Sequence, residues 1–516
     1  MLMLMLSVYA VSWAKEKPKL KVTYRADKLE GIEKENESYK RLIGNVVFIH
    51  KGMTIKADSA QYYDQQGMVE AYGHVEIIDQ EGAVIVADQL LYDTNKQVAQ
   101  LRDSIVYQSD SVTCYTDQLD YDVHAQKGCF FNGGTLIEGE NILSSKSGCY
   151  DEITKSATFY DNVQLQNKAY KVQCDALAYN TITKIATFQG NTTIINPEGD
   201  ILSTTQGGEY NTSNKHSTFQ QSKIESATYT LSADVLRANQ TQDYYEAMGQ
   251  VRLFVKKQNI TISSDHSQYW KEKGIVTVYG NTLLEHVLDA DTLYMTADTL
   301  KAIEGKQGTS HNDDTILAYN NVKIFKSDMQ GKADSMAYHS IDSTIYFYNN
   351  PVFWSHNNQI TAEGIQIVLN DQALDKMYVA PNAFIAAQDT LGNYNQLKGR
   401  EMVAYFQDNK MAYIDIMGNG ESLYFAIGDS LQLVGMNYLR CSHMRIDMDD
   451  ANLSKISFFV QPTGLFYPPP KITEADKQLA DFTWRIMERP TREEVLAHGY
   501  GTKPRYQAFK FTEKSP

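Results

Sequence analysis

The order of apolar and polar residues in this chain changes phase at regular intervals. Around Asp88, apolar side chains occur at Ile85 and Ala87, and then at Leu90 and Tyr92. A spacing of two on each side is the period of a β-strand, in which alternate side chains face the same way. The step of three across Asp88 predicts a bulge or corner, which bends the strand while both halves still face one core.

The same pattern recurs along most of the chain, with an aspartate as its anchor. We expect each anchor to form a structural corner, because a carboxylate there can accept nearby backbone N–H groups. The clear anchors are Asp27, Asp58, Asp88, Asp117, Asp175, Asp234, Asp265, Asp298 and Asp334. Weaker anchors at Lys146, Gln206, Glu363, Arg400 and Met436 extend the series, which gives a mean spacing of about 31 residues between positions 27 and 436.

A second motif lies midway between the anchors. It reads Gly44-Asn45-Val46, Gly73-His74-Val75, Gly190-Asn191-Thr192 and Gly280-Asn281-Thr282, among other copies. Turn-forming residues follow each anchor, as in the run from Asp64 to Gly67. Each repeat therefore supplies two bent strands and two turns, and the Gly-Asn-Val motif starts or bends the second strand.

A repeat of this size cannot bury its apolar face alone, so neighbouring repeats must stack into a continuous core. We predict an all-β fold, an elongated β-jelly roll built from repeats, in the form of an open, V-shaped β-sandwich. Regular repeats are expected over residues 20–300 and more divergent repeats over residues 301–462.

Composition narrows the range of functions. The 516 residues carry a net charge of −15, which argues against nucleic acid as a partner, since such proteins present a basic surface. No nucleotide-binding loop, zinc-protease motif or nucleophile elbow occurs. We therefore expect a protein that is not an enzyme and needs no cofactor or metal.

Residues 1–14 have the form of a secretory signal peptide. The segment is apolar to Tyr9 apart from Ser7, ends in Ser12-Trp13-Ala14, and is followed by charge from Lys15 onward. The alternative is an apolar N-terminus without a targeting role. The prediction is export from the cytoplasm.

Five cysteines occur, at positions 114, 129, 149, 174 and 441, and none has the spacing of a zinc site. In an oxidising compartment, one or two disulfides are compatible with this set, and the odd count leaves at least one cysteine over. The alternative is that all five are small buried side chains in strands.

The repeated Ala-Asp-x-Leu-x-Tyr motif, the Gly-Asn-Val motif and their spacing resemble the OstA-like family, which includes the periplasmic lipopolysaccharide transport protein LptA and the N-terminal domain of LptD. The resemblance covers residues 20–300 well and 300–460 more loosely. It implies a twisted β-jelly roll, open along one side, whose apolar interior holds acyl chains. The chain is longer than an LptA-like protein and has no room for the barrel of an LptD-like protein, so it resembles an elongated, barrel-less member.

The resemblance also implies partners and a location. The expected ligand is lipopolysaccharide, bound by its acyl chains. The expected protein partners are other jelly-roll proteins, such as LptC-like and LptD-like proteins, joined by addition of a strand at a sheet edge, or further copies of this chain joined head to tail. The expected location is the periplasm, with contact to the outer membrane through those partners.

The inward-facing residues of the repeats are the candidates for a lipid-binding groove. The alternative is that these side chains pack only on one another and contact no ligand. The candidates are Ile55, Ile85, Leu90, Tyr92, Leu119, Tyr121, Val172, Leu177, Tyr179, Leu236, Tyr269, Leu300, Met336, Tyr338, Ile360 and Ile365.

Residues 463–516 are predicted to form a C-terminal extension that is rich in proline and partly helical. Pro468-Pro469-Pro470 ends the β pattern. A helix is expected to start at Thr473 and to continue through Leu479, Phe482 and Trp484 until Pro490 breaks it. Whether this segment binds a partner or caps the last strand stays open.

Two other functions are compatible with the repeat. One is an exported enzyme or adhesin built on a parallel β-helix, although its coils are usually shorter and carry one motif each. The other is a purely structural periplasmic scaffold, which would share the fold and differ only in lacking lipid binding.

Overall fold

A computed structural model gives the structure of this protein. It describes residues 22–34, 37–79, 82–109, 112–288, 291–305, 314–370, 373–407, 410–449 and 452–498. The predicted signal peptide lies outside the described residues. The chain divides into two compact units, residues 1–198 and residues 199–516, which we describe separately.

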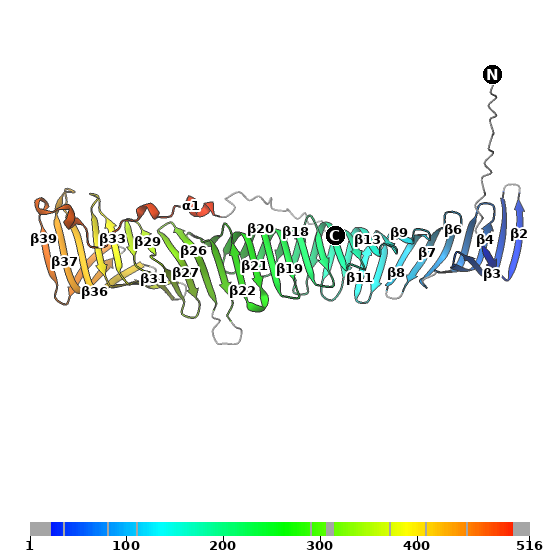
Figure 1. The fold of residues 1–516 in the computed structure, drawn as a ribbon, viewed down its shortest axis with the longest axis horizontal. Helices are drawn as coiled ribbons and strands as arrows, with labels where there is room; N and C mark the ends of the chain where they lie inside the picture. The colour runs from blue at the N-terminus through cyan, green and yellow to red at the C-terminus, as the bar shows by residue number, and fades with distance from the viewer. Residues whose placement is uncertain are drawn as a thin grey trace, which may run out of the picture. The chain divides into compact units, whose positions relative to one another are not determined.

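Several strands of the first unit are labelled in Figure 1. The strands of this unit are β1 (Thr23–Arg25), β2 (Lys28–Lys34), β3 (Glu37–His50), β4 (Met53–Tyr63), β5 (Met68–Ile78), β6 (Val84–Asp93), β7 (Val98–Gln108), β8 (Val112–Asp122), β9 (Lys127–Phe130), β10 (Gly134–Glu138), β11 (Asn141–Ser145), β12 (Ser147–Asp151), β13 (Ser156–Gln166), β14 (Lys171–Asn180) and β15 (Ile185–Ile195).

The second unit continues with shorter and longer strands and ends in the only α-helix of the described residues. Its elements are β16 (Ile201–Thr204), β17 (Gly208–Asn211), β18 (His216–Glu225), β19 (Tyr229–Asn239), β20 (Tyr244–Val255), β21 (Ile260–Trp270), β22 (Ile275–Tyr279), β23 (Leu283–Val287), β24 (Thr292–Thr296), β25 (Thr299–Ile303), β26 (Thr315–Lys326), β27 (Met329–His339), β28 (Thr344–Tyr348), β29 (Val352–Ser355), β30 (Asn358–Thr361), β31 (Gly364–Asn370), β32 (Ala373–Ala380), β33 (Ala383–Gln388), β34 (Tyr394–Gly399), β35 (Glu401–Gln407), β36 (Lys410–Ile427), β37 (Leu433–Asp449), β38 (Asn452–Phe459), β39 (Thr463–Tyr467) and α1 (Arg492–Ala497).

Within each unit, the strands pair in an antiparallel direction, and most long strands pair with the strand that follows along the chain. In the first unit, β4 pairs with β5 and β5 with β6, so that Ile55 faces Ile77 and Ile77 faces Ile85. In the second unit, β26 pairs with β27 in the same way. The all-β prediction is therefore confirmed, and the parallel β-helix alternative is wrong.

The phase change predicted at the anchors is a corner shared by neighbouring strands. Between β4 and β5, Lys56 faces Glu76, and the next pair beyond the shift is Ser59 with Tyr72. Two residues of β5, Gly73 and His74, thus lie opposite Asp58. Both have left-handed φ angles, 73° and 41°, which tighten the bend.

The corner gives each long strand two halves, which belong to two different walls, while short strands such as β9 and β10 belong to one wall only. In the first unit, wall A contains 37–43, 59–63, 68–72, 89–93, 98–102 and 118–122, and wall B contains 46–50, 53–57, 75–78, 84–87, 105–108 and 112–116. The alternation on each half is regular: in β4, Ile55 and Ala57 of wall B and Ala60 and Tyr62 of wall A are buried. The core lies between the walls.

The anchor carboxylates bind the Gly-Asn motif of the neighbouring strand. Asn45 and Asn281 donate side-chain N–H groups to Asp27 and Asp265, each at 2.8 Å, and Asn191 donates its backbone N–H to Asp175 at 2.8 Å. Similar contacts join His74 to Asp58, Gln221 to Asp234, Asn321 to Asp298 and Asn349 to Asp334. Asp88 and Asp117 lie at the register shifts of their own strands.

Among the weaker anchors, Glu363 and Arg400 lie at corners and Met436 was misplaced. Glu363 accepts from Asn382, and the backbone N–H of Arg400 donates to the carbonyl of Gly418, as expected of corners. The anchor placed at Met436 is wrong. The corner of β37 is at Ser442, because Met417 faces His443 and Gly420 faces Cys441 across the shift.

The predicted C-terminal helix is also wrong beyond its first turn. Thr473 and Asp476 form a capping box, but only the short 3-10 turn η3 (Glu474–Lys477) follows it. Residues 478–485 are not helical. The α-helix begins later, after the N-cap residue Thr491, whose side chain accepts from the backbone N–H of Glu494.

Residues 468–498, which we call the strap, run back across the strands of the second unit instead of forming a long helix (Figure 1). Leu479 packs with Phe425 and Met436, and Phe482 and Trp484 lie against the same cluster. The side chain of Gln396 donates to the carbonyl of Lys477 and accepts from the N–H of Leu479. These contacts replace the backbone bonds that a helix would make, so the strap is bound by its own unit.

One disulfide joins Cys129 of β9 to Cys149 of β12, which face each other in adjacent strands. Cys114, Cys174 and Cys441 are free and buried. Burial raises the pKa of the Cys114 thiol to about 11 and that of Cys174 to about 12, so neither is a reactive thiolate.

We predict that Gly73→Ala destabilises the fold by about 1–3 kcal/mol, since a methyl group there would lie 2.6 Å from Asp58 Oδ2 and φ is positive. Gly31→Ala in β2 is the matched control, because a methyl group at that position would have no other atom within 4 Å. Urea unfolding of the purified variants measures the effect. Equal unfolding midpoints for the two variants would contradict the corner.

We also predict that peptide mapping of the protein without reductant recovers a peptide pair linked through Cys129 and Cys149. The other three thiols should react with an alkylating reagent only after unfolding, because they are buried. Cys129→Ser should lower the free energy of unfolding by about 3 kcal/mol. Recovery of a different cysteine pair would show that the register of β9 and β12 is wrong.

Candidate functional site

Most of the predicted lining residues are buried inside their own unit. In the first unit these are Ile55, Ile85, Leu90, Tyr92, Leu119, Tyr121, Val172 and Leu177, and in the second Leu236, Leu300, Met336 and Ile365. The other four predicted lining residues are partly exposed, namely Tyr179, Tyr269, Tyr338 and Ile360.

The interior is filled by these side chains. In the second unit, Leu300, Met336 and Ile365 belong to one apolar cluster, against which Tyr338 and Ile360 pack, while Leu236 belongs to a smaller cluster. The inner faces of the walls thus contact each other through apolar groups. A ligand chain that entered this space would have to replace contacts between side chains.

Polar contacts hold the walls of the first unit together near their ends, away from the corners. His50, at the end of a wall B half-strand, hydrogen-bonds through Nδ1 to Tyr92 Oη of wall A at 2.8 Å. Both side chains are buried, and His50 Nε2 has no partner among the described residues. Burial lowers the pKa of His50, and the charge of Lys51 lowers it further; burial raises the pKa of Tyr92 to about 12.

A second contact of this type lies at the start of the first unit. The Lys40 ammonium of wall A lies 5.5 Å from the centre of the Tyr24 ring and 5.7 Å from that of Tyr62, and it pairs with Asp64 at 3.1 Å. Tyr24 is on β1, which pairs with wall B, so its contact with Tyr62 of wall A also crosses between the walls. Separation of the walls would break these contacts.

The last strands of the second unit leave part of their inner face open. Leu397 packs against the interior cluster and so marks the inner face. The residues of the last strands that lie on the same side are Ser422, Tyr424, Leu439 and Phe466. Tyr424 is 41% exposed and Phe466 is 56% exposed. These residues were not predicted from the sequence, because the Met436 anchor was misplaced. The alternation of residues 422, 424 and 426 could have identified Ser422 and Tyr424.

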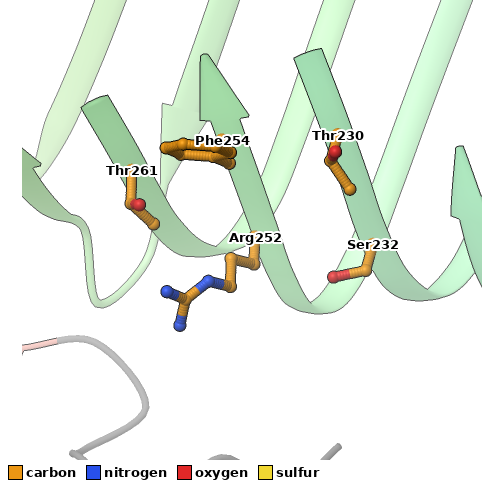
Figure 2. A pocket seen from close by; sticks show the side chains of 5 residues that line it. All are labelled: Thr230, Ser232, Arg252, Phe254 and Thr261. Atoms are coloured by element: carbon orange, nitrogen blue, oxygen red, sulfur yellow. The ribbon is translucent and has the colours of Figure 1, made fainter. Parts of the chain in front are cut away.

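The opposite, outer face of the second unit carries a recess of about 300 Å³. Its lining residues are Thr230, Ser232, Arg252, Phe254 and Thr261, from β19, β20 and β21 (Figure 2). Phe254 lies between Thr230 and Thr261, which are its partners in the adjacent strands. The recess is separate from the interior and was not predicted from the sequence.

The described residues hold no group of three or more His, Cys, Asp or Glu side chains placed to bind a metal. Most of the anchor aspartates contact the bend of a neighbouring strand, and all lie at the corners, outside the interior. In the same residues, no helix is long and apolar enough to cross a membrane. The side chains that face the interior are mainly apolar.

Comparison with known families gives two matches, one in each unit. Residues 18–175 match the model of the OstA-like protein family. Residues 261–373 match the model described as the LptA/(LptD N-terminal domain) LPS transport protein. A search of curated proteins found no match.

We predict that His50 makes the stability of the fold depend on pH. Its pKa is lowered in the folded state, while an unfolded histidine titrates near about 6.5. The unfolded state therefore binds more protons below that pH, so stability is complete above it and falls as the pH is lowered.

His50→Gln should flatten this dependence between pH 7.5 and pH 5.0, whereas His124→Gln, at an exposed position of the same unit, should leave it unchanged. Thermal unfolding of both variants across this range is the measurement. An unchanged slope in His50→Gln would show that His50 does not couple to folding.

Proposed function

Because the chain belongs to the OstA-like family, we propose that it is a lipid-binding protein of lipopolysaccharide transport to the outer membrane, which shelters acyl chains between its two walls. The observation that carries the proposal is that each unit contains a segment matching this family and has walls with apolar inner faces. No catalytic chemistry enters the proposal.

The free-energy cost of exposing an acyl chain to water is large. Each methylene group exposed to water costs about 0.8 kcal/mol, so an acyl chain cannot cross an aqueous compartment without cover. Walls whose inward positions are apolar along successive strands offer the same cover at each position. An acyl chain that moves from one repeat to the next would then exchange equivalent contacts, with little change in free energy.

Since the interior is filled, the proposal requires the walls to separate when lipid enters. In the first unit, the contacts that must yield are the His50–Tyr92 hydrogen bond and the packing of Lys40 on Tyr24 and Tyr62. In the second unit, Tyr424 and Phe466 already present apolar surface on the inner face of the last strands. We propose this surface as a place where an acyl chain enters or leaves the unit.

We further propose that partner jelly-roll proteins dock by adding a strand to a sheet edge. β38 and β39 pair with β37, and among the described residues neither has a second neighbour. Leu465 and Phe466 of β39 are 57% and 56% exposed, which is unusual for an edge that remains unpaired. The prolines after β39 prevent the chain itself from continuing the sheet.

The proposed compartment is the periplasm. The family matches are to envelope proteins, and the Cys129–Cys149 disulfide is compatible with an oxidising compartment. The proposed partners are LptC-like and LptD-like proteins or further copies of this chain.

The filled interior also favours a second candidate, a structural scaffold that binds no lipid. Both candidates have the same fold and the same edges. Lipid contact at inward positions separates them.

We predict that a photo-crosslinking residue in place of Tyr121 or Tyr179 labels lipopolysaccharide in cells, because both side chains face the interior. Tyr160 is the matched control, since it is exposed on the outer side of β13 while Ala157 and Phe159 are buried. Labelling is read as a lipid adduct on denaturing gels. Absence of adducts at several inward positions, or equal labelling at Tyr160, would favour the scaffold.

A further inference from the structure

The outer face of the second unit has a continuous row of directly paired residues. Residues opposite each other in antiparallel strands share a face, so the row can be followed from strand to strand. It runs through Thr230, Phe254, Thr261, Glu285, Tyr294, Phe325, Gln330, Trp354, Gln359, Ala386, Gln396 and Leu423. Their chain neighbours Ile262, Phe353 and Leu397 pack into the interior, so the row itself points outward.

The strap occupies one part of this row and is bound there as a peptide. Gln359 donates to the carbonyl of Thr483 at 2.7 Å and accepts from the N–H of Arg485 at 2.6 Å. Gln396 makes the same pair of bonds to Lys477 and Leu479, each at 2.8 Å. Both glutamines are buried, and each binds the backbone at positions i and i+2.

Side chains of the strap add charge pairing to this backbone contact. Asp481 pairs with Lys398 at 2.7 Å and Glu488 pairs with Lys332 at 2.7 Å. Lys398 and Lys332 each lie two positions along their strands from a row glutamine, Gln396 and Gln330. The outer face of these strands thus binds an extended segment that carries both apolar and acidic side chains.

The described strap ends beside β24 and β26, which α1 contacts, but the row continues. Beyond Tyr294 it passes through Glu285, Thr261, Phe254 and Thr230, and its last three members line the recess. Arg252 lies two positions along its strand from the row residue Phe254. Lys398 and Lys332 have the same spacing from the glutamines of the row. Among the described residues no acidic side chain pairs with Arg252, and Figure 2 shows its guanidinium directed away from the strands.

We propose that this recess binds an extended segment of a partner protein, with a carboxylate on Arg252 and an apolar side chain on Phe254. The proposal rests on continuity with the strap-binding row and on the charge of Arg252. It concerns the outer face and is independent of lipid binding in the interior. A volume of about 300 Å³ is at the lower end for a ligand site and suits one or two side chains of a peptide.

The test uses the full-length protein and a fluorescent synthetic peptide with the sequence of residues 477–489, which carries the required pattern around Asp481. Fluorescence anisotropy should show saturable binding. Arg252→Glu and Phe254→Ser should each weaken binding at least tenfold, while Arg237→Glu, on the same strand as Thr230 but outside the recess, should leave it unchanged.

Charge reversal tests direct contact. A peptide in which the position of Asp481 carries lysine should bind Arg252→Glu more tightly than the wild-type protein. No binding of the original peptide, or binding that neither Arg252→Glu nor Phe254→Ser weakens, would overturn the proposal.

Another occupant is detected with a photo-crosslinking residue in place of Phe254 in the full-length protein. Peptide adducts that the unlabelled peptide competes away support the proposal. Adducts to residues 499–516 of the chain itself would identify its own segment as the occupant and overturn the assignment to a partner.

Discussion

The corner between the two halves of each long strand is the constraint on which the rest of the structure depends. At the corner of β4 and β5, two residues with left-handed φ, Gly73 and His74, lie opposite Asp58. The register shift changes the phase of the strand, so that both halves direct apolar side chains into one interior. Because strands on both sides share the corner, the two walls follow it from repeat to repeat.

This arrangement is predictable from the sequence where the pattern is local. The step of three across Asp88 was enough to predict a bent strand, and the Gly-Asn motif marked the neighbouring bend. The corner was expected mainly at the aspartate, whereas the left-handed residues are those of the Gly-Asn pair and the carboxylate binds them. The anchor at Met436 failed because β36 and β37 are longer than the other strands, which moves the corner to Ser442.

Features that depend on distant residues were not predictable in the same way. Leu479 and Phe482 have an apolar spacing that suits a helix, but Gln396 and Gln359 bind the backbone of this segment in a non-helical form, across 81 and 124 residues of sequence. The pairing of Cys129 with Cys149 follows from the register of β9 and β12, which the cysteine count leaves open. The contact of His50 with Tyr92 joins two walls across 42 residues of sequence.

The two faces of the walls have different chemistry. The inner face offers mainly apolar contact, held shut in the first unit by a few polar groups, and this is the basis for proposing acyl chains as its ligand. The outer face of the second unit offers buried amides and cations, which bind the strap through its backbone and its carboxylates. The fold thus combines an apolar inner face, proposed to bind lipid, with an outer face that binds the strap.

The proposed lipid binding requires the two walls to separate when an acyl chain enters. The most direct measurement is the distance between spin labels in place of Met68 and Ile78, which lie at the two ends of β5 on the outer sides of wall A and wall B. Pulsed electron paramagnetic resonance would record this distance with and without lipopolysaccharide. Wall separation predicts a longer distance when lipid is bound, and an unchanged distance in the presence of bound lipopolysaccharide would contradict it.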